Sequence, residues 1–198
     1  MTLISNQLLQ DIKDYAKCSE KKERYEHSLR VADTIKSLCK RFGLDEQKGY
    51  LAGLSHDICK NMDKQELKLL VASHNVEITE LEEKNPGLLH GKGAAIVLTE
   101  RFGYTDNDVL EAVANHTTGK SGLCNLGKCL FIADRLEPGR SHIDDEYRKS
   151  FDQLDINQTC LKLLQDSMEY LRKVGAEIAP ITYEYEAYLL NEINGGTK

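Results

Sequence analysis

Hydrophobic residues recur with the period of an α-helix along almost the whole chain. No long stretch alternates apolar and polar residues with a period of two, so we expect no β-sheet. Aspartates suited to helix N-caps and glycines suited to helix ends flank the periodic segments: Asp45, Asp106 and Asp155, and Gly43, Gly103 and Gly175. The sequence therefore predicts an all-α fold, with helices over residues 6–18, 20–42, 45–59, 64–74, 88–102, 107–116, 123–136, 156–174 and 182–193.

Length and charge narrow the kinds of protein that this chain can be. With 198 residues and no evident linker or repeat, we expect a single domain over residues 1–198. The formal net charge of -6 argues against a nucleic-acid polymer as partner, because such polymers favour a basic face. A small anionic substrate stays compatible, since a bound metal can supply positive charge locally. With no long apolar segment and no signal peptide, we expect no membrane partner and a cytoplasmic location.

One acidic residue stands at the end of an apolar run. Asp134 follows residues 129–133 and, on a helix, lies one turn after Leu130 and two turns after Leu126, so it shares their inward stripe. A carboxylate drawn into a core must be paired or bound to a metal, because an unpaired buried charge is too costly. Partners of the right kind each lie on a different predicted helix: His27, the pair His56-Asp57, His90 and His116.

The surroundings of the histidines place them on inner faces. His27 lies one turn before Val31 on an apolar stripe, and His116 follows Ala112 by one turn. Small residues leave space around the other two histidines. Ala52 and Gly53 precede His56 and Asp57 by one turn, and His90 is followed by Gly91, Gly93, Ala94 and Ala95. At the segment after His90 another backbone could approach closely. Each histidine alone is best interpreted as a hydrogen-bonded core residue, but four histidines with two aspartates favour a metal site.

The ligand types narrow the metal. Imidazole and carboxylate ligands without thiolates suit iron, manganese, cobalt or zinc, and the six cysteines form no C-x-x-C pair. Neighbouring residues on a helix point about 100° apart, so His56 and Asp57 can reach different sides of one ion or of two. Asp57 is the natural bridge between two ions, which typically lie about 3.5–4 Å apart and generate hydroxide for attack at phosphorus.

The same residues carry a resemblance to a known family. His27, His56-Asp57 and Asp134, in this order, match the H…HD…D signature of the HD-domain metal-dependent phosphohydrolases. The chain is most similar to the YqeK-type branch, the bacterial symmetrical diadenosine tetraphosphatases. Segments 24–29, 54–60, 88–91, 115–119 and 132–140, and more loosely 178–182, carry this likeness and span most of the chain. An isolated His-Asp pair is not specific, whereas His116-Thr-Thr-Gly and Asp134-x-x-Glu-Pro-Gly-Arg are.

The resemblance implies an HD-domain helical bundle that hydrolyses dinucleoside tetraphosphates such as Ap4A symmetrically to two ADP. It implies a small nucleotide as substrate and a divalent transition metal as cofactor. The implied metal is iron, as one ion or two, with manganese or cobalt as substitutes. The resemblance leaves open whether the protein is a homodimer. The implied ligands of the first metal are His27, His56, Asp57 and Asp134, and those of a second metal or of the phosphates are His90 and His116. The implied catalytic residues are Asp57, His90, His116 and Lys60. The implied substrate contacts are His27, Lys60, His90, His116, Thr117 and Arg140, with Ile178, Pro180 and Thr182 near the base.

Other interpretations stay open at this point. The chain could be an HD phosphohydrolase acting on nucleoside monophosphates or cyclic nucleotides, or an oxygenase, because iron held by histidine and carboxylate also activates O₂. A non-catalytic nucleotide-sensing protein is a third alternative, although the intact ligand set argues against it. Lys60 could be a helix-end lysine that interacts with the helix dipole, and Arg140 could be a loop cation rather than a phosphate fork. We expect His74, His142 and the acidic residues 77–83 to be exposed.

Overall fold

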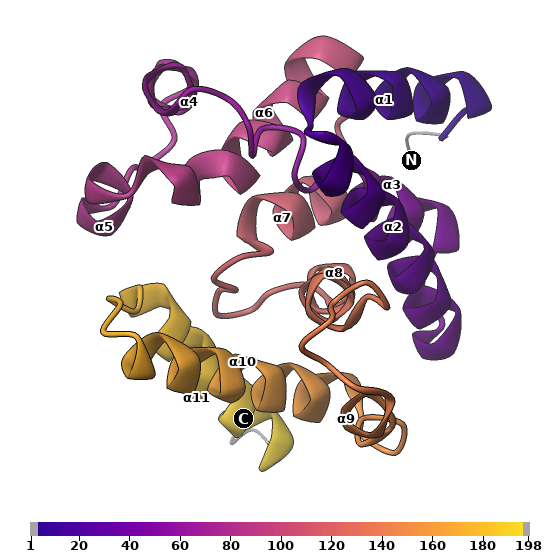
Figure 1. The fold of residues 1–198 in the computed structure, drawn as a ribbon, viewed down its shortest axis with the longest axis vertical. Helices are drawn as coiled ribbons and strands as arrows, with labels where there is room; N and C mark the ends of the chain where they lie inside the picture. Colours follow the sequence, from indigo (N-terminus) through magenta and orange to yellow (C-terminus); the bar gives the residue numbers. More distant parts are fainter. Residues whose placement is uncertain (1–3, 196–198) are drawn as a thin grey trace.

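The computed structural model describes residues 4–195, and these residues form helices without a single strand (Figure 1). The helices are α1 (Asn6–Ser19), α2 (Lys22–Phe42), α3 (Glu46–Ser55), α4 (Lys64–Ser73), α5 (Glu80–Lys84), the 3₁₀ helix η1 (Pro86–Leu89), α6 (His90–Phe102), α7 (Asn107–Asn115), α8 (Asn125–Leu136), α9 (Asp145–Lys149), α10 (Ile156–Lys173) and α11 (Pro180–Ile193). The predicted all-α fold is confirmed. The single domain over residues 1–198 stays a prediction, and its outermost residues lie outside the described range.

Most helix bounds agree with those expected from the sequence, and the capping residues explain why. Asp45, Asp106 and Asp155 each accept backbone N–H groups in the first turn of the helix that follows. Gly43 and Gly103 end α2 and α6 in the left-handed conformation, with φ angles of 70° and 62°. These local signals fix where a helix starts or stops without help from distant contacts.

Three expectations about the helices were wrong. The third helix ends at Ser55, so His56 and Asp57 follow it instead of lying inside it. The helices α5 and α9 were not expected, because five residues are too few to show a periodic stripe. Their N-caps are nevertheless readable: Thr79 forms a capping box with Glu82 at α5, and the Asp144 side chain caps α9. Of the residues expected to be exposed, His74 and His142 are, whereas Glu82 is largely buried in an ion pair with Lys92.

Helix α8 is the centre of the packing, because it is apolar on two sides. One side, with Leu126 and Leu130, joins an apolar cluster built with α1, α2, α3, α4, α6 and α7. The other side, with Phe131 and Ile132, joins a second cluster built with α10 and α11. Figure 1 shows α8 between these two groups of helices. Asp134 lies one turn beyond Leu130 and therefore points towards the larger cluster.

Glycines allow the close helix contacts that bring the polar residues together. A Cβ atom on Gly53 would lie 2.6 Å from the Cα atom of Ala32, so α2 and α3 touch backbone to backbone. A Cβ atom on Gly91 would lie 2.8 Å from the carbonyl oxygen of Val113, at the end of α7. The close backbone approach expected after His90 is thus confirmed. These two contacts lie beside His56 and beside His90, respectively.

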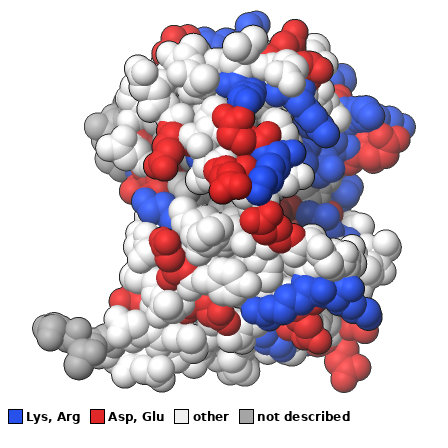
Figure 2. Space-filling model, turned by 90° about the vertical axis from the view of Figure 1, so that its left-hand side faces the viewer, with Lys and Arg blue, Asp and Glu red and all other residues white. Residues whose placement is uncertain are grey.

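Acidic and basic side chains are interspersed on the face shown in Figure 2. They are densest in the upper part, whereas the lower part, where α10 and α11 lie, has more uncharged surface but also a basic ridge and several acidic residues. Among residues 4–195, no helix combines the length and the apolar character that crossing a lipid bilayer requires.

Candidate metal centre

Three of the four candidate histidines lie where helices begin or end. His56 follows α3, His116 follows α7, and His90 is the first residue of α6 after the 3₁₀ helix η1. Each donates its Nδ1–H to the carbonyl oxygen three residues earlier, over 2.7 Å to Gly53, 2.7 Å to Gly87 and 2.8 Å to Val113. Carbonyls near a helix C-terminus lack an intrahelical partner, so helix ends suit these histidines. The sequence placed His90 and His116 near helix ends, and only His56 was expected inside a helix.

His27 is held differently, because it lies inside α2. Its Nδ1–H donates over 3.0 Å to the Glu137 carboxylate. Carbonyl and carboxylate oxygens can only accept, so all four histidines carry their proton on Nδ1 and present a bare Nε2 to the centre. This orientation is the usual one for histidines that bind a metal, where the second nitrogen is fixed by a hydrogen-bond partner.

Asp57 lies at the middle of the cluster. Its Oδ1 is 3.2 Å from His90 Nε2 and 3.7 Å from His116 Nε2, while its Oδ2 is 3.6 Å from His56 Nε2. Two sets of buried ligand atoms, each within 4.8 Å of one another, share this carboxylate: His27, His56 and Asp57, and Asp57, His90 and His116. This sharing is the geometry expected of a carboxylate that bridges two ions.

Asp134 completes the side of the cluster that contains His27. Its Oδ1 lies 3.0 Å from His27 Nε2 and 3.9 Å from His56 Nε2. The His27 contact does not have hydrogen-bond geometry, and the Nε2 atoms of both histidines are buried without a hydrogen-bond partner among the described residues. Lone pairs that face carboxylate oxygens in a core repel each other unless a cation lies between them. These residues therefore fit a divalent metal.

The ionisation of the cluster also suits a metal. Burial alone would raise the pKa of Asp57, but His56, His90 and His116 hold this pKa well below its usual range. Burial likewise opposes ionisation of Asp134, and His27 and His56 hold its pKa low. Burial, aided by His90 and His56, lowers the pKa of His116 to about 3. Anionic carboxylates and a neutral imidazole are the forms that bind metal ions at neutral pH.

Basic side chains surround the two carboxylates. Arg24 Nη1 donates to Asp57 Oδ2 over 2.8 Å, and Arg140 Nη2 donates to Asp134 Oδ1 over 2.6 Å. Lys60 Nζ lies 3.2 Å from His90 Nε2, and partial burial lowers the pKa of Lys60 although Asp57 opposes this. Arg140 is therefore not a free loop cation, and its guanidinium contacts a proposed metal ligand.

Thr117 joins the cluster to the C-terminal segment predicted near the base. Its Oγ1 lies 3.3 Å from both His90 Nε2 and His116 Nε2. One residue later, the Thr118 carbonyl accepts a hydrogen bond from Thr182 Oγ1 over 3.3 Å. Pro180 begins α11 and is exposed, whereas Ile178 is buried in the second apolar cluster. The segment 178–182 thus packs against the turn after His116.

Sequence reasoning missed three residues that support the centre. Arg24 lies three residues before His27 on α2, and Glu137, the C-cap of α8, lies three residues after Asp134, so each lies about one helical turn from a candidate ligand. Arg135 donates to the carbonyls of His116 and Thr117 over 3.3 and 2.9 Å. The helical spacing could have identified Arg24 and Glu137, but nothing in the sequence indicates the Arg135 contacts.

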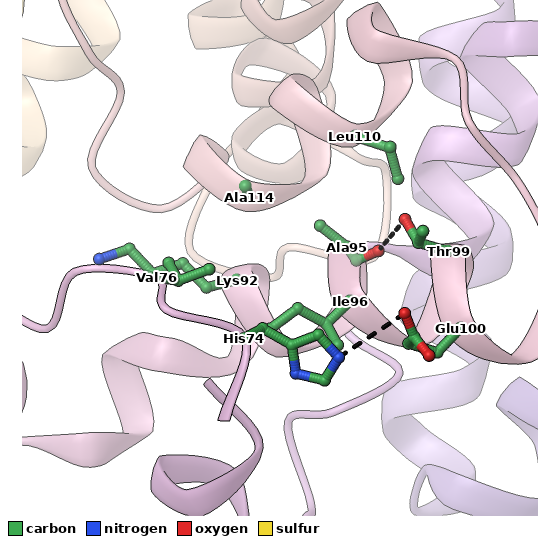
Figure 3. Close-up of a pocket in the computed structure, with 9 residues that line it drawn as sticks. All are labelled: His74, Val76, Lys92, Ala95, Ile96, Thr99, Glu100, Leu110 and Ala114. Carbon is green, nitrogen blue, oxygen red and sulfur yellow. Dashed lines mark hydrogen bonds and ion pairs between the residues drawn. The ribbon is translucent and has the colours of Figure 1, made fainter. Parts of the chain in front are cut away.

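An apolar cavity of about 230 Å³ lies away from this centre, on the outer side of α6 and α7 (Figure 3). Ala95, Ile96 and Leu110 line it, and His74 and Glu100 pair across its edge with a nitrogen–oxygen distance of 3.7 Å. None of its lining residues belongs to the candidate metal centre.

Comparison with known proteins places this site in a family. The HD domain family matches residues 24–139, which include the candidate ligands. The chain is 33% identical over 161 residues to the symmetrical bis(5'-nucleosyl)-tetraphosphatase of Bacillus subtilis. This alignment covers 81% of this chain and 86% of that protein. It is 32% identical to the protein of the same name from Staphylococcus aureus, over 82% of this chain and 84% of that protein.

A solved structure gives the same result for the fold. The crystal structure of a predicted HD superfamily hydrolase involved in NAD metabolism from Clostridium acetobutylicum matches with a TM-score of 0.88 and 31% identity, covering 96% of this chain and 100% of that one. The match to the HD domain family extends over more than half of the chain, and the two named relatives align along most of their length. The chain therefore belongs to the HD domain family and, within it, to the symmetrical bis(5'-nucleosyl)-tetraphosphatases.

Proposed function

We propose that this protein hydrolyses dinucleoside tetraphosphates such as Ap4A symmetrically, adding one water across the central phosphoanhydride to give two ADP. The observation that carries the proposal is the pair of ligand groups sharing Asp57, in a chain 33% identical along most of its length to a protein named for this reaction. The substrate is then a small anionic nucleotide, which suits a centre rich in histidine, arginine and lysine.

The proposed cofactor is a pair of divalent transition-metal ions. Iron is the proposed metal, with manganese or cobalt as substitutes, because imidazole and carboxylate ligands suit these metals. His27, His56, Asp57 and Asp134 would hold one ion, and Asp57 with His90 and His116 would hold the second ion or the phosphates. Bound there, the metal would act as a Lewis acid and lower the pKa of a water molecule.

The side chains around the ligands have separate proposed tasks. Lys60 and Arg140 offset the charge of the tetraphosphate chain and of the leaving ADP, the arginine through its planar fork. Thr117 Oγ1 can donate to a phosphate oxygen near His90 and His116, because it lies 3.3 Å from both rings. Ile178, Pro180 and Thr182 border the base from the C-terminal side. A homodimer and a cytoplasmic location stay predictions.

The test is product analysis on protein purified without oxygen and reconstituted with iron or manganese. Ap4A should give ADP as the sole nucleotide product, and Asp57→Asn, which removes the shared charge, should abolish turnover. Equal amounts of AMP and ATP would reject symmetrical cleavage. Rapid hydrolysis of a nucleoside monophosphate without Ap4A turnover would favour the other HD phosphohydrolase reaction.

A further inference from the structure

The four histidines of the centre are not held alike. His56, His90 and His116 donate their Nδ1–H to backbone carbonyls, whereas His27 donates to the carboxylate of Glu137. A carboxylate partner makes an imidazole a stronger base than a neutral carbonyl does, and outer partners of this kind fix both the tautomer and the ring orientation.

Glu137 is built into the fold for this contact. Its residue is 1% exposed, and Oε1 accepts from His27 while Oε2 accepts from Arg30 Nε over 2.6 Å. The backbone N–H of Gly139, in the turn after α8, donates to the same Oε2 over 2.5 Å. The carboxylate is thus fixed by three donors, so the His27 ring it orients has little freedom to turn.

The two ligand groups of the centre also differ in charge. Asp134 lies 3.0 Å from His27 Nε2, so the group of His27 and His56 has a carboxylate of its own besides the shared Asp57. The group of His90 and His116 has only Asp57, and Lys60 Nζ lies 3.2 Å from its His90 ring. A nearby ammonium opposes a cation, whereas a second carboxylate attracts one. Arg140, whose Nη2 lies 2.6 Å from Asp134 Oδ1, offsets part of the charge of Asp134, but the His27 group still has one carboxylate more than the His90 group.

We propose that Glu137 is a positioning residue that makes the His27 position the tighter of two unequal metal positions, an inference that rests on the proposed function. Metal should then load in two steps, first beside His27 and Asp134 and later between His90 and His116. Glu137 acts through His27 and touches neither the substrate nor the metal.

The test is a Mn²⁺ titration of the chelator-treated full-length protein. Binding is measured by calorimetry and by the electron paramagnetic resonance signal of free Mn²⁺. Wild type should bind two ions per chain with separate affinities. Glu137→Gln keeps the size and an accepting oxygen but loses the charge, and should weaken the first step about 10- to 100-fold while leaving the second unchanged. Glu137→Leu should weaken the first step further.

Two comparisons separate positioning from general destabilisation. Asp106→Asn removes the charge of another largely buried carboxylate, which pairs with Lys48 over 2.7 Å. This pair lies at the N-terminal ends of α3 and α7, whereas His56 and His116 follow their C-terminal ends. The variant should leave both Mn²⁺ affinities at their wild-type values. In a His27→Ala background, Glu137→Gln should have no further effect on the remaining affinity, because the residue through which Glu137 acts is gone.

The outcomes distinguish this inference from the function. Wild-type protein that binds two ions and cleaves Ap4A, with a Glu137→Gln variant of unchanged affinities, would overturn the role of Glu137 alone. Equal weakening of both steps would also overturn it, because it would indicate a general structural role. Wild-type protein that binds no Mn²⁺ would overturn both this inference and the metal centre of the proposed function.

Discussion

Replacing Glu20 by glutamine should stabilise the protein above neutral pH. Glu20 follows α1 and is 7% exposed; its Oε2 accepts from Ser28 Oγ over 2.9 Å, and its Oε1 has no hydrogen-bond partner among the described residues. Burial, reinforced by the charge of Asp57 and opposed by Ser28, raises the pKa of Glu20 from 4.5 to about 7. Folding therefore favours the protonated carboxyl.

The sign and the size of the effect follow from this pKa. The pKa of Glu20 is higher in the folded than in the unfolded protein, so its protonated carboxyl contributes stability that is fully present below about pH 4.5. This contribution is lost as the pH rises through about 7. At about 1.4 kcal/mol per pKa unit, the gap corresponds to about 3 kcal/mol lost by pH 8. Glutamine cannot ionise, so the Glu20→Gln variant should unfold with a free energy about 1–3 kcal/mol above wild type at pH 8 and close to wild type at pH 5.

The assay is urea unfolding followed by circular dichroism from pH 5 to pH 8, in chelator so that no metal charge offsets Asp57. Glu23→Gln is the matched control, because Glu23 is an exposed glutamate in the first turn of α2, and it should keep the wild-type pH dependence. The reasoning is refuted if Glu20→Gln retains the wild-type slope of stability against pH, or if it destabilises the protein at pH 8.

The other predictions concern the metal centre and its support. Gly53→Ala should cost about 1–3 kcal/mol in urea unfolding and weaken Mn²⁺ binding, because its Cβ would lie 2.6 Å from the Ala32 backbone; normal stability would contradict the tight α2–α3 contact. Asp134→Ala should lose metal, Ap4A turnover and the rise in melting temperature on adding Mn²⁺, and a retained rise would exclude Asp134 as a ligand. Arg140→Ala should keep two ions but lower kcat/KM for Ap4A about 10- to 150-fold, equivalent to about 1.5–3 kcal/mol; Arg140→Lys should recover only part of this. Loss of metal from Arg140→Ala, measured by elemental analysis, would instead mean that its 2.6 Å contact with Asp134 holds that ligand in place.

The sequence by itself determined the fold class and the candidate ligands. The helical period and the capping residues are local signals, so α1, α2, α4 and α6 to α8, α10 and α11 could be located before any tertiary contact was known. The candidate ligands could be found because histidine and aspartate on apolar faces are costly without partners. The specific segments around Asp134 and His116 added the family, which the comparisons confirm.

Tertiary structure alone decided which residues meet. A helical period indicates which face is buried, but not which side chain of another helix lies opposite it. The His27–Glu137 contact spans 110 residues and the Arg24–Asp57 contact spans 33, and no local pattern encodes either pairing. Ending α3 at Ser55 frees the last carbonyls of that helix, so His56 donates to Gly53 and turns its other nitrogen towards the cluster. The chain supplies the candidate ligands, and the close packing of α2 on α3 and of α6 on α7 gathers them into one cluster.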